Sequence, residues 1–207
     1  MNIIHQKGYA IEKDVDVVIN SANGWLIQDS SGAGAIRERS DMLNQKEKEL
    51  FEVLFSKLPA NARALYEKKR KDHGRENKLA NLSSIIKIYN NNKSPFSPGD
   101  ALLDDLWSKT DKRRVIHAIT MSYDAKLNER IHGTALSIQT SLEAAFRIVL
   151  SLDAKSVSLP IPCARPEYGL TPEESLQAIM KALEILKDTD ITVIICHDND
   201  YTRALLE

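Results

Sequence analysis

Short runs of β-branched and other apolar residues recur along the chain, and each run ends in small or polar residues. Runs of this length are too short for helices and are typical of strands buried on both faces of a sheet. The pattern predicts strands over residues 15–19, 114–119, 156–160 and 190–196, and a shorter one over 1–4.

Between these runs, apolar residues recur at helical spacing. Residues 140–152 place Leu142, Ala145, Phe146 and Val149 on one face of a helix. Thr171, Pro172 and Glu174 are typical of a helix start, and that helix is expected to run to about residue 187. Shorter helices are expected to open over 34–38 and to cover 201–206. Alternating strands and helices predict a layered α/β domain.

From residue 41 to about residue 87 the chain differs from the rest, because charged residues dominate and large apolar residues recur at helical spacing. Pro59 is expected to separate two helices there. The basic run at residues 67–71 is interpreted as a solvated helix face, with contact to a partner or nucleic acid as the alternative.

The composition favours one large domain spanning residues 1–207. The 207 residues are 43% hydrophobic, carry a formal net charge of -1 and include two cysteines. Such a charge gives no general signal for nucleic acid or membrane binding, and no apolar run approaches the length of a membrane span. So few cysteines fit a reducing cytosol. No signal peptide is evident, so a cytoplasmic location is expected, with secretion independent of such a peptide left open.

The most informative segment is the end of the strand at residues 15–19. Asn20 and Asn23 follow it, separated by small residues, and a Ser- and Gly-rich loop then leads to Ile36. In open α/β sheets, ligands bind at this end of the strands. Asparagine both donates and accepts hydrogen bonds, which suits sugar hydroxyls and amides. The alternative is a simple turn.

Two more loops follow predicted strands, one over residues 161–170 and one after Cys196. Because strand ends gather at one edge of the sheet, the three loops are expected to meet. The second loop leads into the helix at Pro172, and amides near a helix N-terminus attract anions. The pattern predicts two walls around an extended, phosphate-bearing ligand.

In the order of these motifs, the chain resembles the macro domain family. The family has a strand ending in two asparagines, a Gly-rich loop and a helix, as around Asn23 and Gly32. It also has a Gly-x-Ala turn before a Val-Ile-His-Ala strand, as at Gly99 and His117. A strand ending in proline, an aromatic-Gly pair and a final strand follow; here these include Pro160, Tyr168-Gly169 and His197.

The resemblance implies a three-layer α/β/α fold, a mixed sheet between helices, with residues 41–93 as an inserted helical segment. It implies that ADP-ribose or an ADP-ribosylated protein is the ligand, with hydrolysis of an ADP-ribosyl bond as the activity. A non-catalytic reader of ADP-ribosylated protein is the main alternative. A phosphatase acting on a phosphorylated ADP-ribose and a scaffold with a decayed pocket are the others. No cofactor or metal is expected. The insertion is expected to pack near the first loop, and to contact a protein partner or act as a lid if it has a functional role.

When the roles of the family's residues are assigned to the matching positions, Asn23 contacts the distal ribose and is a catalytic candidate. The first loop wraps the diphosphate, the loop from Cys163 to Tyr168 faces it, and His197 lies against the adenine. The ligand-binding set is then Tyr9, Asn20, Ser31, Gly32, Ala33, Gly34, Ile36, Cys163, Ala164, Arg165, Tyr168 and His197.

Some positions depart from the family pattern. Tyr9 and Ala33 stand where many members have an Asp that holds the adenine and an Asp proposed to activate water. Asp29 is the replacement candidate for orienting water, with a turn-forming role as the alternative. Glu167 is the second candidate, with a solvated loop charge as its alternative. Arg37 lies in the region where lysine-dependent members have their lysine.

The second loop also departs, because Arg165, Pro166 and Glu167 replace a Ser-Thr-Gly sequence. Pro166 removes one amide donor. Arg165 is expected to replace it with a charge-assisted contact to phosphate, against the alternative of a surface arginine.

Among the other chemistry-bearing residues, His117 is expected to be a hydrogen-bonded core residue. Cys163 and Cys196 are expected to be buried as small apolar residues. No set of Cys, His and Asp residues has metal-ligand spacing.

Overall fold

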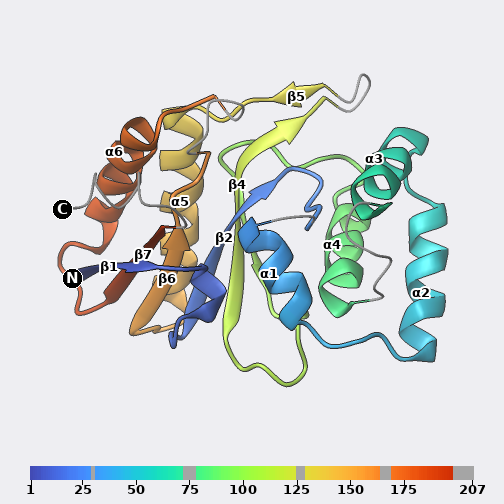
Figure 1. Ribbon diagram of the computed structural model, residues 1–207, viewed down its shortest axis with the longest axis horizontal. Helices are drawn as coiled ribbons and strands as arrows, with labels where there is room; N and C mark the ends of the chain where they lie inside the picture. Colours follow the sequence, from blue (N-terminus) through green and yellow to red (C-terminus); the bar gives the residue numbers. More distant parts are fainter. Residues whose placement is uncertain (29–30, 72–77, 125–128, 164–168, 198–207) are drawn as a thin grey trace.

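A mixed β-sheet forms the centre of the molecule (Figure 1). The computed structural model describes residues 1–28, 31–71, 78–124, 129–163 and 169–197. In this part of the chain the seven strands lie in the order β1-β7-β6-β2-β4-β3, with β5 pairing to β4. Their bounds are β1 Asn2–Lys7, β2 Val17–Asn23, β3 Ala101–Asp104, β4 Arg114–Tyr123, β5 Arg130–Ile131, β6 Ser156–Pro160 and β7 Thr192–His197. The five strands from β1 to β4 in this order are mutually parallel, while β3 and β5 run antiparallel to β4.

Helices cover both faces of the sheet, as the predicted three-layer arrangement requires (Figure 1). Helices α5 and α6 pack on one face, and α1 and α4 on the other, with α2 and α3 beyond α4. The helices are α1 Ser31–Arg39, α2 Gln45–Ser56, α3 Ala60–Lys71, α4 Leu79–Asn90, α5 Ala135–Ser151 and α6 Pro172–Leu183, with short 3₁₀ helices η1 Ala10–Glu12 and η3 Glu184–Leu186.

The face under α5 and α6 carries the largest single apolar cluster. Alternate residues of the strands, such as Val17 and Ile19 of β2, meet Phe146 and Val149 of α5 and Ile179 of α6 there, all essentially buried. Each fully buried side chain of this size contributes about 1.5–3 kcal/mol, so this layer makes a large apolar contribution to stability.

In its described part, the segment at residues 41–93 forms three helices rather than two. The predicted break at Pro59 is confirmed, since α2 ends at Ser56 and α3 begins at Ala60. Helix α4 is the additional one, and Ile85 and Ile88 anchor it in the second apolar cluster.

Helix boundaries differ from the predictions where polar residues begin a helix. Helix α5 starts at Ala135, five residues before the predicted start, because Thr134 and Ser137 cap it reciprocally. Helix α1 starts at Ser31 rather than Gly34. The predicted Thr171 cap is confirmed, and α6 ends at Leu183, with η3 continuing the helical path to Leu186. The short helix expected over 201–206 lies outside the described residues.

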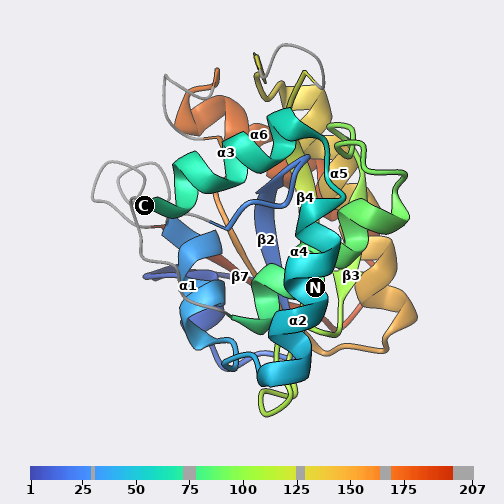
Figure 2. The ribbon, with the colours of Figure 1, turned by 90° about the vertical axis from the view of Figure 1, so that its right-hand side faces the viewer.

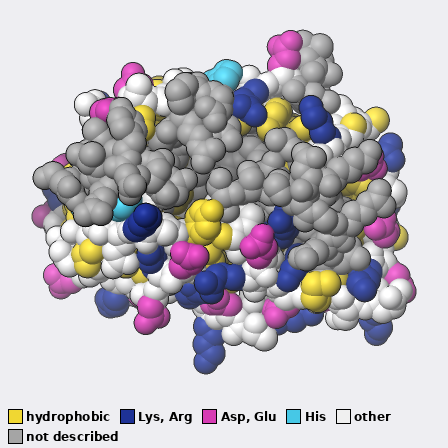
Figure 3. Space-filling view, in the orientation of Figure 1, with side chains coloured by type: hydrophobic (Ala, Val, Ile, Leu, Met, Phe, Trp, Pro, Cys, Tyr) yellow, Lys and Arg dark blue, Asp and Glu magenta, His cyan; other side chains and the backbone are white. Residues whose placement is uncertain are grey.

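The described part of the surface carries acidic and basic side chains interspersed on the face shown in Figure 3. This mixture agrees with the near-neutral formal charge of the whole sequence. Within the described ranges, no helix has both the length and the apolar character needed to cross a membrane.

Candidate functional site

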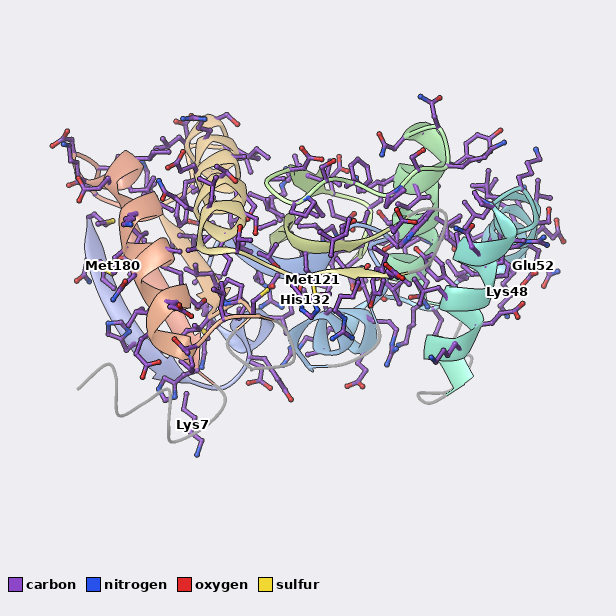
Figure 4. The ribbon with its side chains drawn as sticks, turned by 90° about the horizontal axis from the view of Figure 1, so that it is seen from above. Lys7, Lys48, Glu52, Met121, His132 and Met180 are labelled. Carbon is purple, nitrogen blue, oxygen red and sulfur yellow. The ribbon has the colours of Figure 1, made fainter. Side chains whose placement is uncertain are left out.

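The candidate site lies at the edge of the sheet where β2, β4, β6 and β7 end, which is the upper edge in Figure 1. Because these strands are parallel, their carboxyl ends meet there, as the sequence predicted for the three loops. Asn23 at the end of β2 is in register with Met121 of β4. Figure 4, viewed from this edge, places Met121 and His132 near the middle of the molecule.

Asn23 folds the first loop back on itself. Its side-chain oxygen accepts hydrogen bonds from the backbone amides of Trp25 and Ile27, at 3.1 and 3.3 Å. Its amide nitrogen donates to the carbonyl oxygen of Ile27 at 3.0 Å. That bond uses one of the two amide hydrogens, so Asn23 has both a loop-forming role and a second donor hydrogen for other contacts.

The turn that Asn23 holds is tightly packed. Leu26 has a φ of 54°, in the left-handed region that costs a non-glycine residue about 1–2 kcal/mol. A side chain at Gly24 would place its Cβ 2.0 Å from Ser122 Oγ and 2.3 Å from the Phe96 carbonyl oxygen. The loop therefore keeps its conformation only because the residues around it fix it.

The residues predicted to wrap a diphosphate form the first turn of α1. Ser31, Gly32, Ala33 and Gly34 begin this helix shortly after the end of β2. The first amide groups of a helix lack intrahelical partners and point outward, together with the positive end of the helix dipole. A Cβ added at Gly32 would meet no described heavy atom within 4 Å, so no described residue packs against this position.

Beneath the loop, polar side chains form a buried chain across the sheet. The Asn20 amide donates to Nδ1 of His117 at 3.1 Å, and His117 Nε2 donates to Asp104 at 3.0 Å. Ser83 of α4 donates to the other oxygen of Asp104 at 2.6 Å. Burial opposes ionisation of Asp104, but the hydrogen bonds from His117 and Ser83 outweigh it and lower the pKa of this carboxyl. The expectation that His117 is a hydrogen-bonded core residue is confirmed.

A second polar group lies where β2, β4 and β6 end. The hydroxyls of Ser21 and Thr120 are 2.9 Å apart, and the Cys163 thiol donates to Thr120 Oγ1 at 3.5 Å. Burial raises the pKa of Cys163, so the thiol is neutral and a poor nucleophile near neutral pH. Gly133 packs against it, because a Cβ there would approach Cys163 Sγ to 2.7 Å. Both cysteines are free and buried, as predicted.

The far end of the edge brings Tyr9 and His197 together. The amide of Gly8 donates to the carbonyl of His197 at 3.0 Å, which places Tyr9 beside the end of β7. Tyr9 is 39% exposed, whereas His197 is 7% exposed and its buried Nδ1 has no hydrogen-bond partner among the described residues.

No family model matches the sequence, and no curated protein sequence matches it. The structure, in contrast, is similar to solved macrodomains. The macrodomain of Mycobacterium tuberculosis DarG matches with a TM-score of 0.60 at 14% identity, covering 95% of this chain and 98% of that one. An Oceanobacillus iheyensis macrodomain with ADP gives 0.59 at 14% identity, covering 97% and 85%. A glycine-to-valine mutant of that macrodomain with ADPR gives 0.55 at 16% identity, covering 98% and 87%.

This chain has a macrodomain fold. The expected fold, including the mixed sheet and its two helical layers, is confirmed by these matches over nearly the whole chain.

In this macrodomain fold, the predicted site residues do not all face the same space. Asn23, Gly32, Cys163, Tyr9 and His197 lie along the strand-end edge. Asn20 is turned toward His117. Ile36 is 2% exposed and packs with Ala10, Val18 and Ile194, so its side chain belongs to the core. Asp29, Ala164, Arg165, Glu167 and Tyr168 lie outside the described residues.

Several residues of the macrodomain edge were not singled out by the sequence. Thr120 and Gly133 belong to this group, since an isolated Thr or Gly gives no periodic or motif signal. Arg37, which the sequence placed in the region of the lysine of some family members, is buried and donates to the carbonyl of Gln28 at 2.8 Å, so it supports the first loop from α1. The described residues hold no group of three or more side chains that suits a metal ion.

Proposed function

We propose that this protein binds ADP-ribose along the strand-end edge. The macrodomain fold supports this proposal, because two of the solved structures with that fold are described as holding ADP and ADPR. The positions of Asn23, the first turn of α1, Cys163 and His197 along one edge fit an extended ligand with a sugar at one end and a base at the other.

The first turn of α1 is the observation that carries the proposal. A diphosphate needs several donors and close backbone approach, and a helix N-terminus with small residues supplies both. No described atom lies where a Cβ of Gly32 would be, whereas Gly24 in the same loop is enclosed by Ser122 and Phe96. No described packing contact requires a glycine at position 32. Close approach of a ligand to the backbone would account for this glycine.

The test is titration calorimetry with ADP-ribose, with AMP and ribose 5-phosphate as controls for its two ends. We expect micromolar binding, equivalent to about -8 kcal/mol. Gly32→Leu should weaken binding more than tenfold without lowering the melting temperature, because its side chain enters space the protein leaves open. Glu38→Leu is the matched control, since it adds the same residue at an exposed position of the same helix.

Two results would contradict the proposal. One is the absence of ADP-ribose binding to the folded wild-type protein. The other is a Gly32→Leu variant that binds ADP-ribose as tightly as Glu38→Leu, because the ligand would then not lie against the first turn of α1.

We further propose that the protein hydrolyses an ADP-ribosyl bond, with Asn23 orienting the distal ribose. Asp29 or Glu167 would orient a water molecule toward the anomeric carbon. Water adds to that carbon, the bond to the modified group breaks, and the leaving group takes up the proton. Asp29→Ala and Glu167→Ala should each be assayed for release of ADP-ribose from a modified substrate and for ADP-ribose binding.

A reader of ADP-ribosylated protein is the second candidate. Ala33 favours it, because a common hydrolase subclass of the resembling family has an Asp at this position. If the wild-type protein binds ADP-ribose but releases none from modified Glu, Asp, Ser or Arg side chains, the reader function stands. Loss of turnover with retained binding in Asp29→Ala or Glu167→Ala would support the enzyme instead.

A further inference from the structure

The inserted helices α3 and α4 contact the first loop directly. Figure 2 shows α3 crossing above the end of β2. Ala62, Leu65 and Tyr66 of α3 share one buried cluster with Trp25, Leu26 and Ile27 of the loop. The insertion is therefore part of the environment of the candidate site.

Tyr66 makes the most specific of these contacts. Its hydroxyl donates to the backbone carbonyl of Trp25 at 2.6 Å, and the two residues are 3% and 1% exposed. A buried carbonyl needs a hydrogen-bond donor, and a bond formed away from water is stronger than one at the surface. The phenol of α3 thus fixes the backbone of the loop.

The Tyr66 ring is itself held in place by α2. Phe55 meets it edge to face, with ring centroids 6.1 Å apart and an interplanar angle of 83°. Phe55 stacks in turn on Phe51, at 5.7 Å between centroids. The position of the phenol oxygen is therefore set by both α2 and α3.

Helix α4 holds the other end of the same loop. Gln28 donates through its side-chain amide to Ser84 Oγ at 3.2 Å. Before α4, Lys78 Nζ donates to the carbonyls of Glu38 and Ser40, at 3.1 and 3.2 Å, where α1 ends. The insertion thus contacts the loop at Trp25 and Gln28 and also the far end of α1.

We infer that Tyr66 is a positioning residue for the candidate site: its bond to the Trp25 carbonyl keeps the first loop in its ligand-ready conformation. This inference rests on the proposed binding of ADP-ribose. The loop includes Leu26 in the left-handed region, so it does not keep this shape by local preference. Without the hydrogen bond from the Tyr66 phenol, the loop samples other conformations. Binding must then order the loop, which weakens the affinity for the ligand.

The test is Tyr66→Phe, which removes only the phenol oxygen and keeps the ring against Phe55. We expect ADP-ribose binding to weaken by roughly fivefold to tenfold, the loss typical of one buried hydrogen bond. Tyr89→Phe is the matched control on α4. Its ring lies 5.9 and 5.4 Å from the ammonium groups of Lys57 and Lys93, contacts that phenylalanine retains.

Hydrogen exchange separates positioning from general destabilisation. In the free Tyr66→Phe variant, the amides of Trp25 and Ile27 should exchange faster, while those of β4 stay protected. Saturating ADP-ribose should restore the protection of the loop. A uniform increase in exchange over the sheet would overturn the inference, because Tyr66 would then act on the whole fold.

The two proposals fail in different ways. If wild-type protein binds ADP-ribose and Tyr66→Phe binds it within twofold as tightly, the inference is wrong and the proposed function stands. If wild-type protein binds no ADP-ribose, the proposed function is wrong. Exchange in the free variant then decides the remaining point: unchanged rates at Trp25 and Ile27 overturn the ordering role of Tyr66, and locally faster rates support it.

Discussion

Both faces of the sheet bury apolar clusters, the first under α5 and α6 and the second under α1 and α4, but the second face also buries a polar chain that includes a histidine and a carboxylate. On the first face, residues such as Phe146 and Ile179 pack against alternate strand residues. On the second face, Asn20, His117 and Asp104 form a hydrogen-bonded chain that ends at Ser83 of α4.

The two kinds of contact differ in how strongly they depend on the position of particular atoms. Apolar contacts depend on area and shape, so they stabilise the fold without fixing one particular backbone segment. Hydrogen bonds join named atoms, so the second face ties the strands, α3, α4 and the first loop into one arrangement. We therefore expect mutations on the first face to change global stability, and mutations on the second face to affect the candidate site as well.

Phe146→Ala should have the largest effect on stability. The side chain is fully buried in α5, and truncating such a residue costs about 3–5 kcal/mol through lost transfer energy and the cavity that remains. Urea unfolding measures this loss. In the folded variant, hydrogen exchange of the loop amides at Trp25 and Ile27 should match the wild type. A selective increase at these amides would contradict the proposed difference between the two faces.

Asp104→Ala should reduce stability by about 3 kcal/mol at neutral pH, because it leaves His117 and Ser83 without their buried acceptor. The effect should depend on pH. The pKa of Asp104 is lowered on folding, so its contribution is complete above the unfolded value of about 3.9 and is lost as the pH falls through the lower folded value.

Urea unfolding at several pH values tests this prediction. The stability difference between wild type and Asp104→Ala should be constant from about pH 5 to 7 and shrink below about pH 4. Asp105→Ala is the matched control, since Asp105 is the next residue and is exposed. A pH-independent difference for Asp104→Ala would show that the carboxylate is not stabilised in its ionised form.

The apolar face and the layered fold could be predicted from the sequence because periodicity reports them. The helix face with Leu142, Ala145, Phe146 and Val149 is buried as expected. The strand ending in Asn20 and Asn23 was also recognisable. The helix after it was expected to open at Gly34, yet it begins at Ser31, because helix starts rich in Ser and Gly resemble loops in sequence.

The links on the polar face could not be predicted because they join residues far apart in the chain. Ser83 and Asp104 lie in different elements, and no short motif contains both. Tyr66 carries the helical spacing of an ordinary core residue, and only the fold brings its hydroxyl to Trp25. Hydrogen-bond partners of this kind depend on tertiary distance, which sequence periodicity does not report.

Two serine-to-alanine variants give the smallest and most closely matched comparison of the faces. Ser84 and Ser141 are both buried helix residues, on α4 and α5. Ser84 Oγ donates to the Ala80 carbonyl and accepts from Gln28, whereas Ser141 Oγ donates to the Ile138 carbonyl within its own helix.

Ser84→Ala should lower the free energy of unfolding by about 1 kcal/mol and speed hydrogen exchange of the first loop, since Gln28 loses its acceptor. Ser141→Ala should be near neutral, because a hydroxyl bonded to its own helix adds little and alanine is a better helix former. The contrary result would be that both variants lose the same stability and neither changes hydrogen exchange of the loop. The polar face would then not position the loop.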